Sequence, residues 1–276
     1  MSLPIALQLY SVRNELSSDF ENSIRKIKDF GYDGVEFAGL HNQKPLYIKS
    51  LLEQVGLNPI SAHVSLDEML KDTDKIFETY SYLGCKYIAV PYLPEQRRPN
   101  NAMFNQTLKD IELLGRKAKQ VGLQLLYHNH DFEFVKIGDK FGLDVIYESI
   151  SEDLLKTELD TCWIKVAGQN PVEYIRKYAG RAPVVHLKDF YKKETMRQVK
   201  MYDLIGVASD QEKASDVDTF GFVPLGFGMQ DIPSILYASV DAGAKWVVVE
   251  QDMPQKGRTA LECARLSIKY LNNLIW

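Results

Sequence analysis

The sequence predicts an α/β protein, a single (β/α)8 barrel, and three observations lead to this fold class. The chain has 276 residues and is 45% hydrophobic, which suffices for one large core. Short β-branched runs alternate with longer amphipathic stretches, as in a parallel sheet covered by helices. Eight such units suit a closed barrel better than an open, doubly wound sheet. We therefore expect one domain that spans residues 1–276.

A recurring pattern marks the passage from a helix to the next strand. An amphipathic stretch ends, a glycine follows, and a β-branched or aromatic run begins shortly afterwards. Glycine adopts the left-handed conformation that often ends a helix at little cost. The clear instances are at Gly31, Gly84, Gly122 and Gly243. With these joints in place, the predicted strands are 5–10, 34–37, 58–63, 86–91, 123–129, 156–160, 183–188 and 245–250.

One long irregular stretch, roughly 190–228, lies between the seventh predicted strand and its helix. Long loops that follow the carboxyl ends of barrel strands usually cover an active site. The stretch contains Gly226-Phe227-Gly228, which is weak as a phosphate loop because no lysine or Gly-Lys-Ser/Thr accompanies it. A tight turn is the more frequent interpretation of such a pair of glycines.

Polar side chains end four consecutive predicted strands, and the carboxyl ends of barrel strands meet at one mouth. Imidazole nitrogens and carboxylate oxygens together suit manganese, magnesium, cobalt, iron or zinc. Any one such residue is more often a helix cap or a loop hydrogen-bonding group, but four strands in succession favour a shared divalent cation. The residues are His128 and His130 on the fifth strand, Asp160 on the sixth, His186 and Lys188 on the seventh, and Glu250 on the eighth.

These strand ends resemble those of the xylose isomerase-like TIM barrels, also described as the sugar phosphate isomerase/epimerase family. The similar motifs are Leu159-Asp160-Thr161, His186-Leu187-Lys188-Asp189 and Val249-Glu250, together with Leu7–Arg13 and Gly34-Val35-Glu36 in the first two strands. The resemblance covers essentially the whole chain. It implies that Asp160, His186 and Glu250 bind the metal ion.

The fifth strand departs from the family pattern. Members that act on free sugars usually have Glu-Asn-His there, whereas this chain has His128-Asn129-His130. His128 thus stands where a glutamate would be both metal ligand and base. Imidazole is a good ligand but carries no charge when neutral, so the sequence leaves open whether His128 binds the metal.

The resemblance implies a metal-dependent isomerase or epimerase that acts on a sugar or sugar phosphate through an enediolate at a metal-bound carbonyl. Epimerisation needs a base on each face of the substrate, and the first carboxylate is missing. The sequence therefore keeps two alternatives. One is a lyase or hydratase that acts on a keto-sugar or keto-inositol, and the other is a non-catalytic sugar-binding barrel.

The predicted catalytic residues are Glu250, His130 and Lys188, with oxyanion stabilisation as a second role for Lys188. Glu133 is a further acid/base candidate, although a solvated loop carboxylate is the more frequent interpretation. The predicted substrate contacts are Glu36, His63, Arg13 and Trp163; a buried, hydrogen-bonded structural role is the equal alternative for His63.

Charge and composition restrict the partners. With 33 basic and 37 acidic residues, the net charge of -4 provides no field for a polyanion. The apurinic endonucleases of the same superfamily carry a histidine where this chain has Trp163, which also argues against nucleic acid. We find no export signal and no run of about 18 apolar residues, and three widely spaced cysteines suit reduced thiols. We expect a cytoplasmic protein with a small carbohydrate substrate; a homo-oligomer stays open.

Overall fold

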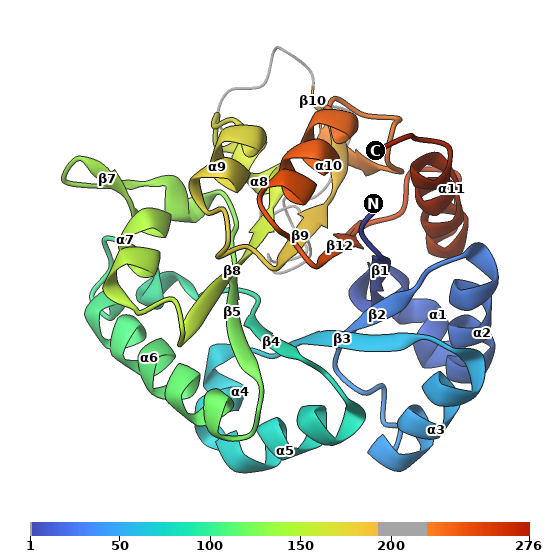
Figure 1. Cartoon of the computed structure of the whole chain (residues 1–276), viewed down its shortest axis with the longest axis horizontal. Coiled ribbons are helices and arrows are strands. Elements are labelled where there is room, and N and C mark those ends of the chain that lie inside the picture. The colour runs from blue at the N-terminus through green and yellow to red at the C-terminus, as the bar shows by residue number, and fades with distance from the viewer. Residues whose placement is uncertain (1, 193–219) are drawn as a thin grey trace, which may run out of the picture.

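The computed structural model describes residues 2–192 and 220–276. Eight parallel strands close into a barrel in the order β1-β12-β9-β8-β5-β4-β3-β2, with helices around the outside (Figure 1). The predicted (β/α)8 fold is confirmed, and each strand lies close to its predicted bounds. The barrel strands are β1 (Ile5–Gln8), β2 (Gly34–Ala38), β3 (Asn58–His63), β4 (Tyr87–Val90), β5 (Gln124–His128), β8 (Leu155–Asp160), β9 (Val184–Leu187) and β12 (Trp246–Val249).

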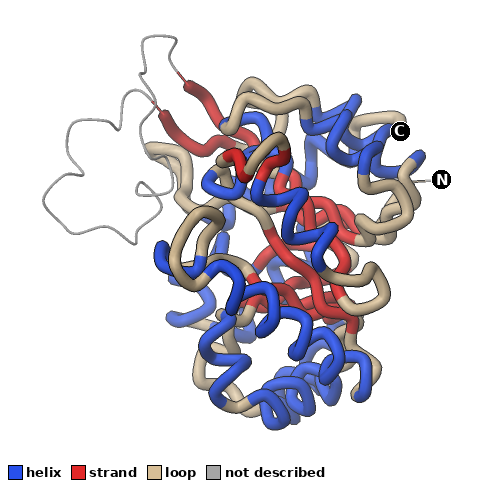
Figure 2. The backbone as a smooth tube through the Cα atoms, turned by 90° about the vertical axis from the view of Figure 1, so that its left-hand side faces the viewer, coloured by secondary structure: helices blue, strands red, loops and turns tan. Residues whose placement is uncertain are grey.

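Helices connect the strands and cover the outside of the barrel; in the side view of Figure 2 the barrel strands run through the middle of the molecule with helices on either side. The α-helices are α1 (Arg13–Ser18), α2 (Phe20–Phe30), α3 (Pro45–Val55), α4 (Leu66–Lys71), α5 (Thr73–Leu83), α6 (Phe104–Gln120), α7 (Gly142–Ser149), α8 (Thr161–Val166), α9 (Pro171–Lys177), α10 (Ile232–Asp241) and α11 (Ala260–Asn272). Short 3-10 helices are η1 (Leu9–Val12), η2 (Glu95–Arg97) and η3 (Phe132–Phe134).

The four glycines that mark the predicted helix–strand joints all have positive φ. The values are 104° for Gly31, 97° for Gly84, 78° for Gly122 and 81° for Gly243. A side chain on the Cα would make this backbone conformation unfavourable. The local sequence therefore specifies where each of these helices ends, as the pattern predicts.

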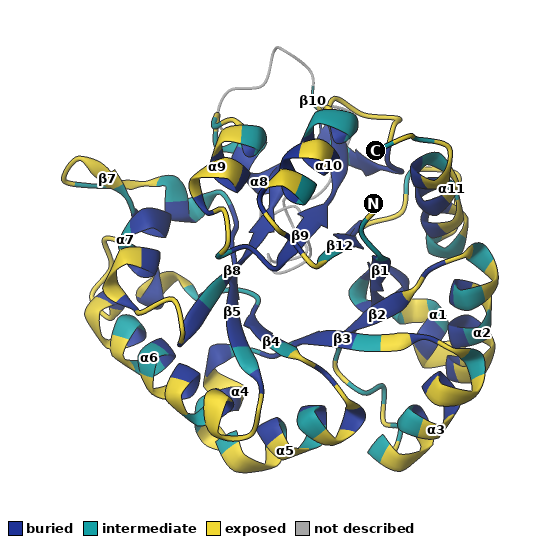
Figure 3. Cartoon of the chain, in the orientation of Figure 1, coloured by how far each residue is buried: buried dark blue, intermediate teal, exposed yellow. Residues whose placement is uncertain are grey.

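The hydrophobic core has two main layers. Inside the barrel, small and branched side chains from six strands fill the space: Ala6, Ile60, Ala89, Leu126, Val184 and Val248. Between the barrel and the helices lies a much larger apolar layer, and the outer faces of the helices are exposed (Figure 3). Because the strands are covered on both sides, a charged side chain in a strand is buried and requires a partner.

The register of the central strands places polar residues side by side. On β5 and β8, His128 pairs with Glu158. On β8 and β9, Asp160 pairs with His186. Residues two apart in a strand point to the same face of the sheet, so Glu158 and Asp160 both direct their side chains to one side. These pairings bring together residues that are far apart in the sequence.

The predicted irregular stretch 190–228 is wrong at its edges. Asp189–Lys192 (β10) and Phe220–Val223 (β11) form an antiparallel ribbon. Residues 193–219, which make up most of the predicted stretch, lie outside the described residues. A second small ribbon, β6 (Lys136–Ile137) with β7 (Lys140–Phe141), follows β5 and is not expected from the sequence.

Two further features concern the cysteines and the helices. Cys85, Cys162 and Cys263 are free and buried. Within residues 2–192 and 220–276, every helix is too short or too polar to cross a bilayer.

Candidate metal and active site

A cavity of about 400 Å³ opens at the carboxyl ends of the barrel strands. Its walls come mainly from residues that end or follow strands, which is where active sites of such barrels lie. They include His63, His128, His130, Lys188, Glu250 and Asp252, with Tyr10, Tyr80 and Tyr92 as apolar surfaces. All three predicted catalytic residues therefore line one cavity.

Four buried side chains, of which His128 and Glu250 line this cavity, form what we call the mouth group: His128, Asp160, His186 and Glu250. One ligating atom from each lies within 4.8 Å of the others. Nδ1 of His186 is 2.9 Å from Oε2 of Glu250, and Nε2 of His128 is 3.6 Å from Oδ2 of Asp160. The structure thus brings together all four of the predicted metal ligands.

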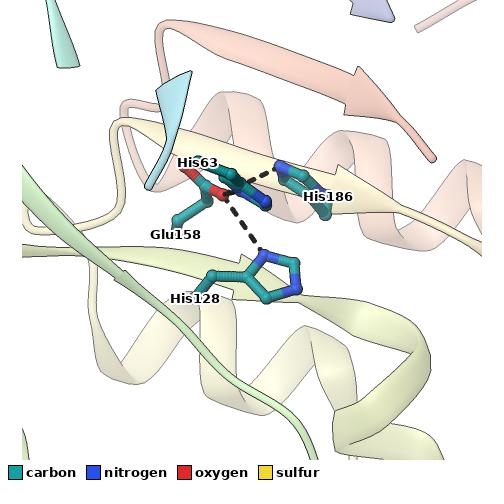
Figure 4. A group of neighbouring side chains, drawn as sticks. All are labelled: His63, His128, Glu158 and His186. Carbon is teal, nitrogen blue, oxygen red and sulfur yellow. Dashed lines mark hydrogen bonds and ion pairs between the residues drawn. The ribbon is translucent and has the colours of Figure 1, made fainter. Parts of the chain in front are cut away.

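A second group, here called the floor group, adjoins the first and shares His128 and His186 with it. It adds His63 and Glu158. Oε1 of Glu158 lies 2.5 Å from Nε2 of His63, 3.2 Å from Nδ1 of His128 and 3.0 Å from Nε2 of His186. Figure 4 shows this carboxylate among the three imidazole rings.

Glu158 is a residue that the sequence analysis missed as part of the site. The sequence could have indicated Glu158, because this residue stands two positions before Asp160 and so lies on the same face of the strand as Asp160. A charged residue within a strand covered on both sides also calls for a partner. Its pairing with three histidines, however, depends on the register of β5, β8 and β9.

Glu36 also belongs to the floor of the barrel, beneath the cavity wall. It is fully buried, and its Oε1 accepts a hydrogen bond from Nε2 of Gln8 at 2.8 Å. The same oxygen is 2.8 Å from Nε2 of His186 and 3.2 Å from Nε2 of His63. The described cavity lining includes His63 but not Glu36, so the geometry argues against the predicted contact of Glu36 with substrate.

Lys188 provides the positive charge of the mouth group. Its Nζ is 3.0 Å from Oε2 of Glu250 and 3.1 Å from both Oδ2 of Asp160 and Oδ2 of Asp252. Burial lowers the pKa of this amine, but the three carboxylates outweigh burial and hold the pKa well above its usual range. Lys188 is therefore an ammonium ion.

The carboxylates of the site differ in charge state. Burial raises the pKa of Glu250, but Lys188 and His186 outweigh it and hold the pKa well below the usual range. The pKa of Glu158 is likewise held low, because the imidazoles of His63, His186 and His128 outweigh burial. For Asp252, burial and the neighbouring carboxylates together raise the pKa to about 6 despite Lys188. Glu158 and Glu250 are thus ionised at neutral pH.

The histidines fall into two classes. For His186 and His63, burial lowers the pKa, but Glu36 and Glu158 outweigh it and raise the pKa overall. For His128 and His130, burial dominates and lowers the pKa, well below the usual range in the case of His130. His130 is therefore a neutral imidazole, and its buried Nδ1 has no hydrogen-bond partner among the described residues.

Two of the predicted substrate contacts have other partners. The guanidinium of Arg13 donates to the backbone oxygens of Tyr10 and Asp252, both at 2.8 Å. Trp163 is fully buried, with its ring 5.3 Å from that of His130. Neither side chain is part of the described cavity lining. The geometry instead gives Trp163 a packing contact with a predicted catalytic residue.

Glu133 is fully buried, so the interpretation of it as a solvated loop carboxylate is wrong. It accepts hydrogen bonds from Tyr127 Oη at 2.6 Å and from the backbone nitrogen of His130 at 2.8 Å. Burial raises its pKa to about 8, since these donors offset burial only in part. Glu133 fixes the backbone of His130 but does not line the cavity.

The described residues fit a divalent cation. Oε2 of Glu158 in the floor group and Oε2 of the adjoining Glu36 are buried and have no hydrogen-bond partner among the described residues. Buried polar atoms are normally satisfied, so these oxygens without partners fit a bound cation. Two imidazoles with two carboxylates are a suitable ligand set for zinc, manganese, cobalt or iron.

Comparisons with known proteins point in one direction. A family model described as the xylose isomerase-like TIM barrel matches residues 24–274. The inosose dehydratase of Geobacillus kaustophilus (strain HTA426) is 22% identical over 275 residues, 91% of this chain and 86% of that protein. The inosose dehydratase of Clostridium botulinum (strain Alaska E43 / Type E3) is 26% identical over 201 residues, 66% of each protein.

Solved structures share the same fold. A sugar phosphate isomerase/epimerase from Parabacteroides distasonis ATCC 8503 superposes with a TM-score of 0.74 at 21% identity, over 98% of this chain and 94% of the other. A protein named IOLI, whose structure holds a zinc atom, superposes with a TM-score of 0.71 at 16% identity, over 98% and 96% of the two chains. At these identities the likeness shows the fold alone.

Proposed function

Because this chain belongs to the xylose isomerase-like TIM barrel family, we propose that it is a metal-dependent dehydratase that removes water from a keto-inositol or keto-sugar. The sequence favours an isomerase or epimerase and keeps a lyase or hydratase as its alternative. The curated relatives named inosose dehydratase support that alternative.

The observation that carries the proposal is the asymmetry of the acid and base groups at the cavity. His130 offers a neutral imidazole whose buried Nδ1 has no hydrogen-bond partner among the described residues. Lys188 offers an ammonium ion held by three carboxylates. A dehydratase needs one group to take a proton from carbon and another to give a proton to the departing hydroxyl group, and these two groups differ in kind. The pair of carboxylates that the resembled epimerases use, one on each face, lacks its first member here.

A divalent cation, when bound, acts as a Lewis acid toward the substrate carbonyl and thereby makes the neighbouring C–H bond more acidic. The mouth group is where we expect this cation, with His128, Asp160, His186 and Glu250 as its ligands. The zinc atom in the IOLI structure supports a cation in this fold. The proposal of a dehydratase requires only that one of the two adjoining groups holds it.

We assign the first proton transfer to His130. Its ring is fixed by stacking on Phe132, at 5.3 Å between centroids and 7° between planes. The backbone of His130 is held by Glu133. A fixed, neutral imidazole at the cavity surface is suited to take the proton from the carbon next to the carbonyl. The electron pair of that C–H bond then forms a C=C bond as the hydroxyl group on the next carbon leaves.

We assign the second proton transfer to Lys188. The departing hydroxyl group becomes water when it gains a proton, and the buried ammonium of Lys188, which lines the cavity beside Glu250, can give that proton. Its neighbour Asp252, with a pKa of about 6, lies 3.1 Å away and can return a proton to the amine. Glu250 serves as a carboxylate ligand that also keeps Lys188 protonated.

The lining of the cavity favours an uncharged substrate over a sugar phosphate. Lys188 is the one lysine or arginine in the described lining, and carboxylates neutralise it. Arg97 is paired with Asp110 at 2.8 Å, away from the cavity. The backbone N–H groups of Gly226 and Gly228, which could cradle a phosphate, both donate to Asp189 at 3.0 Å.

The test is a direct assay of the metal-loaded protein with inosose and with a panel of unphosphorylated keto-sugars. We expect mass spectrometry to show loss of one water, dependence on a divalent cation and loss of activity with a chelator. Interconversion of epimers without loss of water would instead support the isomerase. A protein that neither binds a divalent cation nor turns over any substrate would support the non-catalytic sugar-binding barrel.

A further inference from the structure

His128 and Glu158 form a pair that the proposed function does not explain. Nδ1 of His128 lies 3.2 Å from Oε1 of Glu158 with hydrogen-bonding geometry. Nε2, on the other side of the ring, lies 3.6 Å from Oδ2 of Asp160, within the mouth group. Each ring nitrogen of this imidazole thus meets a different carboxylate.

This geometry fixes the tautomer of the ring. An ionised carboxylate has no proton to donate and can only accept hydrogen bonds, so the nitrogen that faces Glu158 must carry the proton. In a neutral imidazole the other nitrogen then presents its lone pair. For His128 that lone pair is on Nε2, which is the atom in the mouth group. Glu158 therefore prepares His128 to bind a cation.

The charge of Glu158 has the same effect. Its side chain is fully buried, and histidines are its only described ion-pair partners. A carboxylate that accepts a hydrogen bond from a ligating imidazole raises the basicity of the ligand and fixes its orientation. A neutral imidazole at position 128 brings no negative charge to the mouth group. Glu158 supplies a negative charge next to His128, in contact with the ligand and not with the cation itself.

The register of the two strands brings His128 and Glu158 side by side. His128 and Glu158 are register partners on the adjacent strands β5 and β8, and Glu158 shares its face of β8 with Asp160. One strand therefore supplies both the residue that orients the imidazole and a carboxylate that would share the cation with it. Oε2 of Glu158 has no hydrogen-bond partner among the described residues, so the ion pairs of this side chain are all made by Oε1 with imidazoles.

From these contacts we propose that Glu158 is a positioning residue that converts His128 into a metal ligand. It does so by holding the Nδ1 proton and by supplying the negative charge that His128 lacks. This inference rests on the proposed function only in that a cation binds in the mouth group.

The test compares Glu158→Gln, Glu158→Asp and a control, Asp144→Asn. Asp144 is also a buried carboxylate, but its partners are Tyr178 at 2.6 Å and Lys177 at 2.8 Å, and it is a member of neither cation group. The readouts are the affinity for Co²⁺, from competition with a chelator, and the visible spectrum of bound Co²⁺. Nitrogen NMR of the histidine rings, without metal, reports the tautomer of His128.

We expect Glu158→Gln to weaken Co²⁺ binding by roughly 10- to 100-fold, the range for a lost carboxylate partner of a ligating histidine. The spectrum should change and the Nδ1-protonated form of His128 should no longer dominate. Glu158→Asp should recover part of the affinity, and Asp144→Asn should match the wild type. Circular dichroism checks that each variant is folded.

Three results would overturn the inference. The first is wild-type affinity and an unchanged His128 tautomer in Glu158→Gln. The second is a wild-type protein in which His128 carries its proton on Nε2. The third is complete loss of binding in Glu158→Gln while Asp160→Asn and Glu250→Gln still bind, since Glu158 would then be a ligand. If the wild type binds no divalent cation, the proposed function fails, whereas the NMR tautomer still tests the role of Glu158 separately.

Discussion

The ammonium nitrogen of Lys188 lies 3.0 Å from Oε2 of Glu250, inside the group of side chains that also suits a divalent cation. The same nitrogen is 3.1 Å from Oδ2 of Asp160. Both carboxylates of the mouth group therefore contact one protonated amine. Lys188 stabilises this cluster of negative charge, and it also competes with any metal ion for the same oxygens.

Replacement of Lys188 by methionine should separate these two effects. We expect the metal-free variant to be less stable by about 3–5 kcal/mol, because buried carboxylates lose their partner. Added Mn²⁺ should then raise its melting temperature by more than it raises that of the wild type. Differential scanning fluorimetry measures both, with Lys177→Met as the control. An equal or smaller shift in Lys188→Met would contradict the competition.

Loss of a ligand from the mouth group should abolish activity without loss of the fold. We expect Glu250→Gln and His186→Ala to reduce the affinity for the divalent cation by more than roughly 10- to 100-fold, which is the loss typical when only the hydrogen-bond partner of a ligand is removed. Residues at the carboxyl face of a barrel serve function more than stability. Plasma mass spectrometry and turnover check this, with the exposed Glu148→Gln as the control. Wild-type metal content and turnover in both variants would remove the proposed site.

His130 should affect the proton transfer and not the cation. We expect His130→Gln to lower kcat by roughly 100- to 10,000-fold, the usual contribution of a general base. The affinity for Co²⁺ should change little, because His130 is not a member of either group. Steady-state kinetics and chelator competition measure the two quantities. A variant that loses both in the same proportion would point to a structural role for this ring.

Glu133 should make the stability of the protein depend on pH. Its folded pKa is raised to about 8 from the usual 4.5, so between these values the folded state keeps a proton that the unfolded state has lost. Stability due to this group is thus present at low pH and is lost as the pH rises through about 8, by about 1.4 kcal/mol per pH unit at most.

The comparison with Glu133→Gln isolates that contribution. From about pH 6 to about pH 8, we expect urea unfolding to show a fall in the stability of the wild type relative to the variant on the order of 1–3 kcal/mol. The variant itself should be somewhat less stable at pH 6, because its amide cannot accept from both Tyr127 and His130 as the carboxyl oxygens do. Parallel pH profiles of the two proteins would exclude a raised pKa.

Asp189 should stabilise the turn at residues 224–230. Its two oxygens accept four backbone hydrogen bonds, from Phe190 at 2.9 Å, Gly226 and Gly228 at 3.0 Å, and Gln230 at 3.1 Å. Asp189→Asn turns one acceptor into a donor that faces other donors, so we expect a loss of roughly 2–4 kcal/mol. Hydrogen exchange should become faster in this turn. Unchanged exchange there would show that other contacts maintain it.

Local sequence predicted most of the fold. Helix ends are encoded by single residues such as Gly31 and Gly243, whose positive φ depends only on the nearby backbone. Strands covered on both sides read as apolar runs. The ribbon formed by β10 and β11 was not predicted, because its strands are far apart in the sequence and an antiparallel partner cannot be inferred from either strand alone.

The sequence by itself determined that Asp160, His186 and Glu250 would end neighbouring strands, since the order of strands in a barrel follows from the repeating βα unit. Only the tertiary structure decided that Glu158 would meet three histidines and that Lys188 would lie between Glu250 and Asp160. The physical reason is that a contact between side chains on different strands depends on register and on the face to which each points. A shift of one residue reverses that face, and no local pattern records it.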